Sequence, residues 1–217
     1  MKGFCFGIYN GIRFDESHFD PWIQDLSVLR LDMIIPDSGP GGRVMHAFQP
    51  YPLDFFETHP FEKFDKQWAE VVVSDGKGGA NAMTVSWGAF GTIWNKPCVT
   101  LYVRESRYTH DLLENTDKLS INFFSEDYKQ ALKFLGTVSG RNENKIQEAR
   151  LHVGLDNEIP YIDEANLLFF CRKLSATPIT ASQILDEDIL NAQYKTGKKE
   201  GDFHTMYICE VMKAAAR

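Results

Sequence analysis

The chain of 217 residues lacks paired cysteines. Its four cysteines, Cys5, Cys98, Cys171 and Cys209, stand far apart, and none has a histidine at metal-ligand spacing. This arrangement predicts neither a structural zinc site nor a disulfide framework. Because 43% of the residues are hydrophobic, we expect one compact domain, or one domain with an appendage, that folds without either aid. The reducing cytoplasm is the expected compartment.

The sequence also lacks excess positive charge and long apolar runs. Its 30 acidic and 23 basic residues give a formal net charge of -7. Attraction to nucleic acid or to an anionic membrane needs clustered lysine and arginine, so we expect neither partner. No run reaches the roughly 20 apolar residues of a membrane helix, and the first residues do not form a signal peptide.

Signature motifs of several enzyme classes are missing as well. The chain contains no ordered Ser-His-Asp set, no His-Glu-x-x-His and neither of the glycine-rich nucleotide fingerprints. These absences weigh against a hydrolase and against a Rossmann dehydrogenase.

Residues 1–44 differ from the rest of the chain. They carry scattered aromatic residues without a sustained period and close on a Ser-Gly-Pro-Gly-Gly run at 38–42, which is typical of a linker. Two interpretations stay open: a start assigned too far upstream of Met45, or an arm that covers a partner. We therefore predict an N-terminal extension of unknown role at 1–44 and one domain at 45–217.

From residue 68 onward, short β-branched and aromatic runs alternate with turn signals. The glycines of 75–79 can take the positive φ of a hairpin turn between the first two runs. Because strands outnumber helices and do not alternate with them, we expect a small antiparallel barrel with capping helices. The predicted strands are 68–74, 81–87, 98–104, 119–124, 166–176 and 204–212.

Three helical segments are expected between the strands. Thr109 is the predicted cap of the helix at 110–116, and Ser125 of a helix at 126–135 that stops at Gly136. The third helix is predicted at 142–151.

Residues 81–97 allow two interpretations. In the structural one, Thr84 and Ser86 point outward, while Trp87 and Trp94 fill the barrel and glycines ease a bend. In the functional one, the polar residues of this stretch contact a ligand. The sequence that follows favours the second interpretation.

A cluster of polar and cationic residues stands where the third strand leads into a helix. A helix N-terminus offers free N–H groups, and two arginines can fork onto phosphate oxygens, so the cluster suits an anion. An arginine near such a turn is also often only solvated surface. The cluster consists of Arg104, Ser106, Arg107, Tyr108 and Thr109.

Two further features have a functional and a structural interpretation. The segment 139–145 carries Ser139, Arg141 and Lys145, which make either a second cationic patch or a polar turn. His204 precedes the last strand, where a single histidine is more often structural than functional.

Cys171 and Cys209 lie within strand patterns and are expected to be core residues.

Six segments, taken in order, together resemble the flavin reductase-like family, especially its flavoredoxin-like branch. The resemblance covers about residues 62–213. It implies an FMN-binding split β-barrel, antiparallel and of Greek-key type, that forms a homodimer with flavin at the subunit interface. The segments read "NAMTVSWGAFGTIWNKP", "VRESRYTHDLLEN", "SINFFSEDYKQAL", "SGRNENK", "CRKLSA" and "FHTMYICEV".

The resemblance also implies roles for individual residues. Met83, Thr84, Ser86 and Trp87 would lie along the isoalloxazine ring, with Trp87 closing the pocket. His204 would stand at the flavin face where a nicotinamide approaches. The groups around the ribityl phosphate would be Arg104, Ser106, Arg107, Tyr108, Thr109 and Lys145.

The chain departs from the family pattern in two places. Cys209 stands where the family generally has glycine, and 1–44 has no family counterpart. The resemblance implies an FMN-dependent oxidoreductase that takes hydride from NADH or NADPH. The alternatives are an FMN electron carrier that serves protein partners without its own nicotinamide site, and a flavin-free binding module.

Overall fold

The computed structural model describes residues 8–9, 12–13 and 45–217. The chain divides into two compact units, 1–32 and 33–217. In the first unit, β1 (Ile8–Tyr9) pairs antiparallel with β2 (Ile12–Arg13). The rest of the predicted N-terminal extension at 1–44 lies outside the described residues, as does Cys5.

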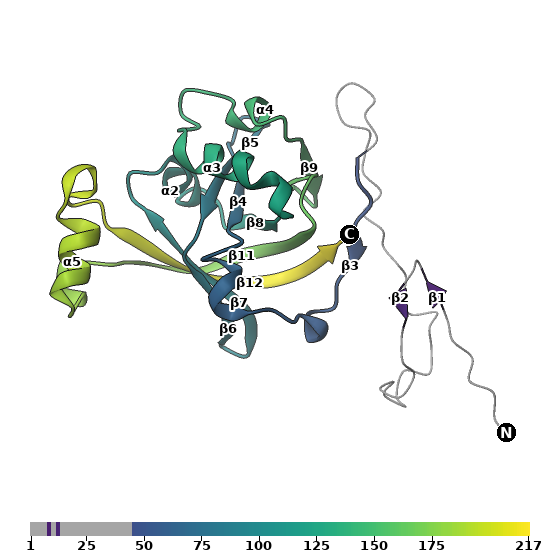
Figure 1. Ribbon diagram of the computed structural model, residues 1–217, viewed down its shortest axis with the longest axis horizontal. Coiled ribbons are helices and arrows are strands. Elements are labelled where there is room, and N and C mark those ends of the chain that lie inside the picture. Colours follow the sequence, from purple (N-terminus) through teal and green to yellow (C-terminus); the bar gives the residue numbers. More distant parts are fainter. Residues whose placement is uncertain (1–7, 10–11, 14–44) are drawn as a thin grey trace. The chain divides into compact units, whose positions relative to one another are not determined.

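The second unit is built on an antiparallel sheet (Figure 1), in which the predicted strands all occur. Its hydrogen-bonded order is β5-β4-β8-β11-β12-β7-β6, and β3 pairs with β12. The end strands β5 and β6 are not joined by a ladder in the described part of the chain, so the hydrogen-bonded sheet is open. The strands are β3 (Gln49–Pro50), β4 (Ala69–Ser74), β5 (Ala80–Val85), β6 (Gly88–Ile93), β7 (Lys96–Arg104), β8 (Lys118–Phe123), β11 (Leu167–Pro178) and β12 (His204–Ala216).

The predicted hairpin between the first two strands is confirmed. β4 and β5 pair antiparallel from Ala69 to Ser74, and the Asp75 N–H donates to the Gly79 carbonyl at 3.0 Å. Gly76 and Gly78 have φ of 72° and 89°, which side chains other than glycine rarely adopt. The local turn chemistry was therefore sufficient to predict this pairing.

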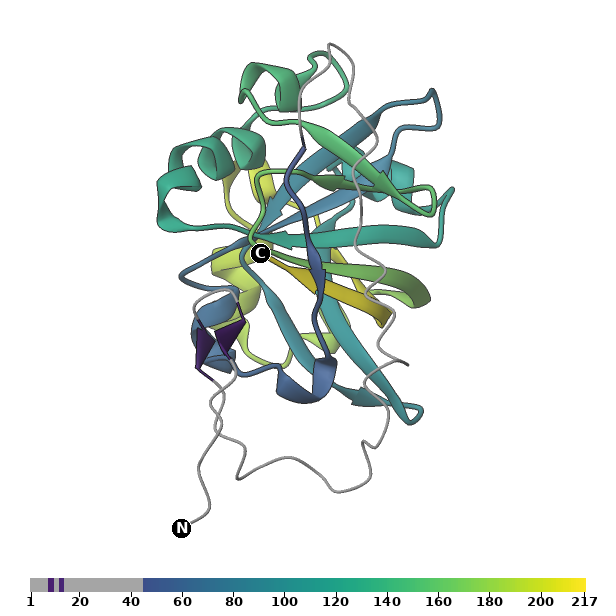
Figure 2. The same cartoon turned by 90° about the vertical axis from the view of Figure 1, so that its right-hand side faces the viewer.

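Short helices and one hairpin cover the sheet. α3, α4 and the β9–β10 hairpin cover one face of the sheet (Figures 1 and 2), whereas α2 contributes Leu113 to the core on the other face. α5 lies at the far end of the long arm formed by β11 and β12 (Figure 1). None of the helices in the described part of the chain has the length and apolar character to span a bilayer. The elements are α1 (Pro60–Lys63), α2 (Tyr108–Leu113), α3 (Lys129–Thr137), α4 (Lys145–Glu148), α5 (Glu187–Tyr194), β9 (Val153–Asp156) and β10 (Ile159–Ile162).

The predicted helix boundaries were wrong in three places. Thr109 lies inside α2 instead of capping it, because its hydroxyl accepts a hydrogen bond from Asn81 in the interior. Ser125 precedes a 3-10 turn, η3 (Glu126–Tyr128), and α3 then runs through Gly136 to Thr137. The third helix is one turn, α4, where ten residues were expected.

The core has two layers, one on each face of the sheet. Val71 and Val73 of β4 pack into the inner layer with the aromatic rings of Phe64 and Phe123, and Val72 packs into the outer layer beneath α3. A strand buried on both faces needs an unbroken apolar run, which explains the valines of β4. Cys171 and Cys209 lie in the inner layer, as predicted for core residues.

Residues 81–97 do not form one strand. The chain bends at Ser86 and Trp87, between β5 and β6. A Cβ on Gly88 would lie 2.8 Å from the Phe64 ring, so only glycine fits there without a shift. The structural interpretation that Trp87 and Trp94 fill the barrel was wrong, since they are 42% and 61% exposed and phenylalanines occupy the interior.

Candidate functional site

A cavity of about 230 Å³ lies where β5, the turn after β7 and the loop after α3 converge. Six of the sequence-predicted site residues line it together, although they come from three separate segments. Antiparallel pairing brings β5 beside β4, and α2 packs against both strands, which places these segments side by side. The predicted residues at the cavity are Met83, Ser106, Arg107, Tyr108, Thr109 and Lys145.

Three cations border this cavity. Arg107 Nη2 donates to the Gly136 carbonyl at 2.7 Å, and Lys145 Nζ donates to the carbonyls of Leu135 and Val138 at 2.7 and 3.0 Å. Arg141 Nη1 donates to the Ser106 carbonyl at 3.0 Å. The bonds to carbonyl oxygens, which are neutral acceptors, hold Arg107 and Lys145 in place without cancelling their charge. Arg141 also forms an ion pair with Asp111, with Nη2 2.5 Å from Oδ2.

Burial shapes the electrostatics of two of the cations. Desolvation lowers the pKa of Lys145 to about 8 and also lowers the pKa of Arg107. Partly desolvated cations interact more strongly with an anion than solvated ones, because the effective dielectric constant is lower. The cavity therefore suits an anionic group, and a phosphate above all, since arginine can bond it in a bidentate manner.

Asn81 adds an unused acceptor to the same cavity. Its side chain is 4% exposed, and Nδ2 donates to Thr109 Oγ1 at 2.8 Å. Oδ1 is buried without a hydrogen-bond partner. Because leaving such an atom unpaired costs about 1–3 kcal/mol, a ligand hydroxyl or amide that donates to it would be favoured. A phosphate joined to a polyol, as in FMN, fits this donor and acceptor set.

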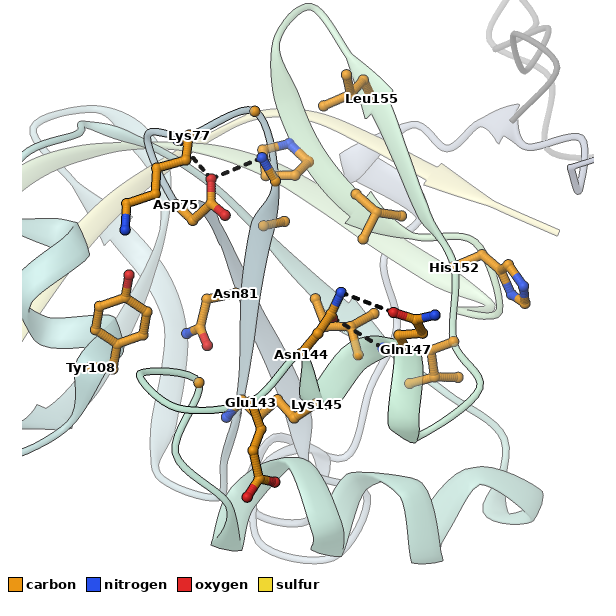
Figure 3. A pocket seen from close by; sticks show the side chains of 18 of the residues that line it. Asp75, Lys77, Asn81, Tyr108, Glu143, Asn144, Lys145, Gln147, His152 and Leu155 are labelled. Atoms are coloured by element: carbon orange, nitrogen blue, oxygen red, sulfur yellow. Dashed lines mark hydrogen bonds between the residues drawn. The ribbon is translucent and has the colours of Figure 1, made fainter. Parts of the chain in front are cut away.

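A larger cavity of about 1000 Å³ lies next to this one, and Figure 3 shows side chains that line it. The two share Asn81, Tyr108 and Lys145. Asp75 shapes the far wall by accepting from the N–H groups of Lys77 and Gly79, both at 2.8 Å.

Ser86 and Trp87 line a different cavity, of about 420 Å³, with walls that include Phe61, Tyr102 and Tyr194. Here the Trp87 ring centroid is 4.9 Å from that of His204. Several flat side chains around one space suit a planar ring.

His204 stands behind this aromatic wall. Its Nδ1 lies 2.8 Å from the Tyr194 hydroxyl, and burial first, then the nearby Arg104 charge, lowers the pKa of His204 to about 4. The imidazole is therefore neutral at neutral pH. A neutral ring beside a second planar ring can orient it without placing a positive charge there.

Two of the predicted residues lie away from these cavities. Arg104 donates to the carbonyls of Asp202 and Gln193, at 2.5 and 3.2 Å. It faces Tyr194 instead of the cavity that Arg107 and Lys145 line. The Thr84 hydroxyl is turned toward α3, where it lies 2.5 Å from the Leu132 carbonyl oxygen. Neither side chain lines either of the cavities that the other predicted ligand-binding residues line.

Sequence reasoning missed Asn81, Glu70 and Gly140 as site residues. Asn81 and Glu70 are polar residues at buried positions of β5 and β4, and polarity inside an apolar run was the available signal. Gly140 approaches Asn81 so closely that a Cβ would lie 2.1 Å from Oδ1. That proximity depends on a loop more than fifty residues away and leaves no local trace in the sequence.

Comparison with known proteins places this geometry in context. The flavin reductase like domain matches residues 68–217. A flavoredoxin from Methanosarcina acetivorans is 18% identical, with a TM-score of 0.55 over 77% of this chain and 74% of that one. The flavoredoxin of Desulfovibrio vulgaris (Miyazaki F) is 16% identical, with a TM-score of 0.55 over 83% and 76% of the two chains.

A third structure, an FMN-binding domain of a flavin reductases-like enzyme from Shewanella baltica OS155, is 15% identical. Its TM-score is 0.55 over 80% of this chain and 79% of that one. No curated protein matches the chain. These structural likenesses show the fold, while the family match spans most of the described domain. The resemblance noted in the sequence is confirmed, and the chain belongs to the flavin reductase-like family.

Proposed function

We propose that this chain is an FMN-binding oxidoreductase that passes hydride from NADH or NADPH to flavin and electrons onward. The observation that carries the proposal is the cavity lined by Arg107, Lys145 and Asn81, with Asn81 Oδ1 unpaired, which we call the phosphate cavity. Structural neighbours named as FMN-binding proteins support it. Bound FMN would supply the two-electron chemistry between a nicotinamide and an acceptor.

The protein's own residues would bind and orient the cofactor. Arg107 and Lys145 would hold the phosphate, and Asn81 Oδ1 would accept from the ribityl chain. Ser86 and Trp87 would meet the ring. The neutral His204 would position the reduced nicotinamide, which arrives uncharged, and would not repel the cationic ring that forms when hydride leaves.

A second candidate function is an FMN electron carrier that exchanges electrons with a redox protein and has no nicotinamide site of its own. The flavoredoxins among the structural neighbours favour it. Adding NADH or NADPH to the FMN-loaded protein without oxygen separates the two. Bleaching of the flavin absorbance supports the oxidoreductase, and an unchanged spectrum supports the carrier. Protein that stays colourless after incubation with FMN would instead be a flavin-free binding module.

His204→Ala should slow reduction by NADH about tenfold, equivalent to about 1.4 kcal/mol of transition-state stabilisation, with FMN affinity nearly unchanged. The reason is that His204 contacts Trp87 and Tyr194 but does not line the phosphate cavity. Stopped-flow absorbance of the loaded protein measures the rate. The exposed His59→Ala is the matched control. Equal rates in all three proteins would assign His204 a purely structural role.

We also propose that the protein is a cytoplasmic homodimer with flavin near the interface. Large apolar side chains are exposed on the described domain, among them Phe61 at 91% and Leu185 at 93%, and a subunit contact would remove them from water. Free thiols at Cys98, Cys171 and Cys209 suit a reducing compartment. Light scattering at micromolar concentration should give twice the mass of one chain. A monomer that still holds FMN would contradict the interface site.

A further inference from the structure

Glu70 is a buried acid with an incomplete set of hydrogen bonds. It lies in β4 among alanine and valines, with its side chain fully buried. Its Oε2 atom has no hydrogen-bond partner. An ionised carboxylate in this position would leave a charged oxygen unpaired in an apolar layer, which is far more costly than an unpaired neutral oxygen.

The contacts of Thr84 indicate where the proton lies. Thr84 Oγ1 is within hydrogen-bond distance of Glu70 Oε1 and lies 2.5 Å from the Leu132 carbonyl oxygen. A hydroxyl carries one proton, and a carbonyl oxygen can only accept. Both contacts are hydrogen bonds when Thr84 donates to Leu132 and a protonated Glu70 donates to Thr84.

This pair lies directly beneath the cations of the phosphate cavity. A Cβ on Gly136 would lie 3.1 Å from the Thr84 Cβ, and Arg107 donates to the carbonyl of the same glycine. Lys145 donates to Leu135, one residue before it. Desolvation raises the pKa of Glu70 to about 8, against the lowering effects of a Thr84 hydroxyl that donates to the ionised carboxylate and of the Lys145 and Arg107 charges. When Thr84 donates to Leu132 instead, the first of these lowering effects is absent.

We propose that Glu70 is a positioning residue of the phosphate site that carries a proton. Ionisation of Glu70 weakens phosphate binding, and Glu70 takes up a proton when phosphate binds. The inference rests on the proposed function, because it takes the ligand to be FMN. A phosphate dianion and an ionised Glu70 would compete for the same two cations, Arg107 and Lys145. Phosphate binding therefore shifts the Glu70 equilibrium toward the neutral acid.

Few other groups around Glu70 could take up or release a proton when phosphate binds. β5 contributes the Thr84 hydroxyl, α3 the Leu132 carbonyl, and β8 the Asn122 amide, whose Nδ2 donates to the Glu70 carbonyl at 3.3 Å. None of these titrates. From β10, Tyr161 packs in the same layer, and burial raises its pKa to about 12, so it stays neutral. Lys145 is the one neighbouring group among the described residues that titrates in the same range.

A first test needs no ligand and compares Glu70→Gln with the unmodified protein. Glutamine imitates the neutral acid, since its amide can donate to Thr84. Because the pKa of Glu70 is raised on folding, its stabilising effect is present below about pH 4.5 and is lost as the pH rises to about 8. The thermal midpoint of Glu70→Gln relative to the unmodified protein should therefore rise between pH 5 and pH 8. A difference that does not change with pH would overturn the buried neutral acid, and the exposed Glu62→Gln is the control.

The second test measures protons taken up when FMN binds at pH 8.5. Calorimetry in two buffers of different ionisation enthalpy gives this number directly. The unmodified protein should take up protons on Glu70 and on Lys145, and Glu70→Gln should lose roughly half a proton or more of that uptake. Riboflavin, which has no phosphate, should cause almost none.

The outcomes distinguish a failure of the Glu70 coupling from a failure of the proposed FMN binding. Equal proton uptake by Glu70→Gln and the unmodified protein, with FMN bound to both, would overturn the coupling alone. A complete lack of FMN binding by both proteins would overturn the proposed function, while the ligand-free test would still decide whether Glu70 is neutral.

Discussion

Arg107→Ala should erase most of the protein's preference for FMN over riboflavin, which we expect to be about a hundredfold or greater. Arg107 lines the phosphate cavity and is held there by the Gly136 carbonyl. Charge-assisted hydrogen bonds contribute about 1.5–3 kcal/mol each, so two of them correspond to about 3 kcal/mol or more, or about a hundredfold in dissociation constant. Riboflavin affinity should hardly change, because Ser86 and Trp87 lie at another cavity.

Calorimetry on the apo-protein with both ligands, at low and high salt, measures this preference. Arg172→Ala is the matched control, because it removes the same charge from an exposed site where Arg172 pairs with Glu210. The chain has a net charge of -7, so its overall field repels phosphate and only a local cluster can bind it tightly. Equal affinities of the unmodified protein for FMN and riboflavin would contradict the phosphate site.

The structure also indicates which cationic residues determine the preference for FMN over riboflavin. The family resemblance implied that Arg104, Arg107 and Thr109 all lie around the phosphate. Arg104 faces Tyr194 and donates to carbonyls near the arm, whereas Lys145 is buried beside Arg107. The preference should therefore depend on Arg107 and Lys145 more than on Arg104.

Gly140→Ala should lower FMN affinity about tenfold or more while leaving the fold intact. The new Cβ would lie 2.1 Å from Asn81 Oδ1 and 3.4 Å from Tyr108, so either the loop or Asn81 must move. A displaced Asn81 loses its bond to Thr109 and its unpaired acceptor, and the cavity loses volume. A loss of about 1.4 kcal/mol or more, within the range for one buried polar group, corresponds to this change.

Gly91→Ala is the control for this substitution. A Cβ on Gly91 would meet no atom within 4 Å, so its effect on binding should be negligible. Flavin fluorescence quenching measures both affinities, and circular dichroism checks that both variants are folded. Unchanged FMN affinity in Gly140→Ala would show that the ligand does not occupy the space between Gly140 and Asn81.

Local sequence predicted the features that depend on neighbouring residues. The glycines of 75–79 predicted the β4–β5 hairpin, because positive φ is a property of single residues. Along β7, Val99, Leu101 and Val103 stand at every second position, a pattern typical of a strand with one buried face, and all three are buried. Six ordered segments predicted the family, since their order does not depend on the details of packing.

Features that depend on long-range packing were not predictable in the same way. Thr109 has the character of a helix cap, but a buried amide 28 residues away offers it a better partner, so it lies inside α2. Trp87 and Trp94 have the size of core residues, but phenylalanines already fill the interior, so both tryptophans lie at the surface.

The sequence by itself determined the antiparallel β class of this protein, its family and six of the residues that line the cavity beside β5. Only the tertiary structure decided that Arg104 faces the segment between β11 and β12 and that Asn81 Oδ1 is left unpaired. It also decided that Glu70 lies near the two cations Arg107 and Lys145. The reason is physical. Strand propensity and turn chemistry act between neighbours along the chain, whereas burial, desolvation and hydrogen-bond partners are set by segments that meet only when the whole chain folds.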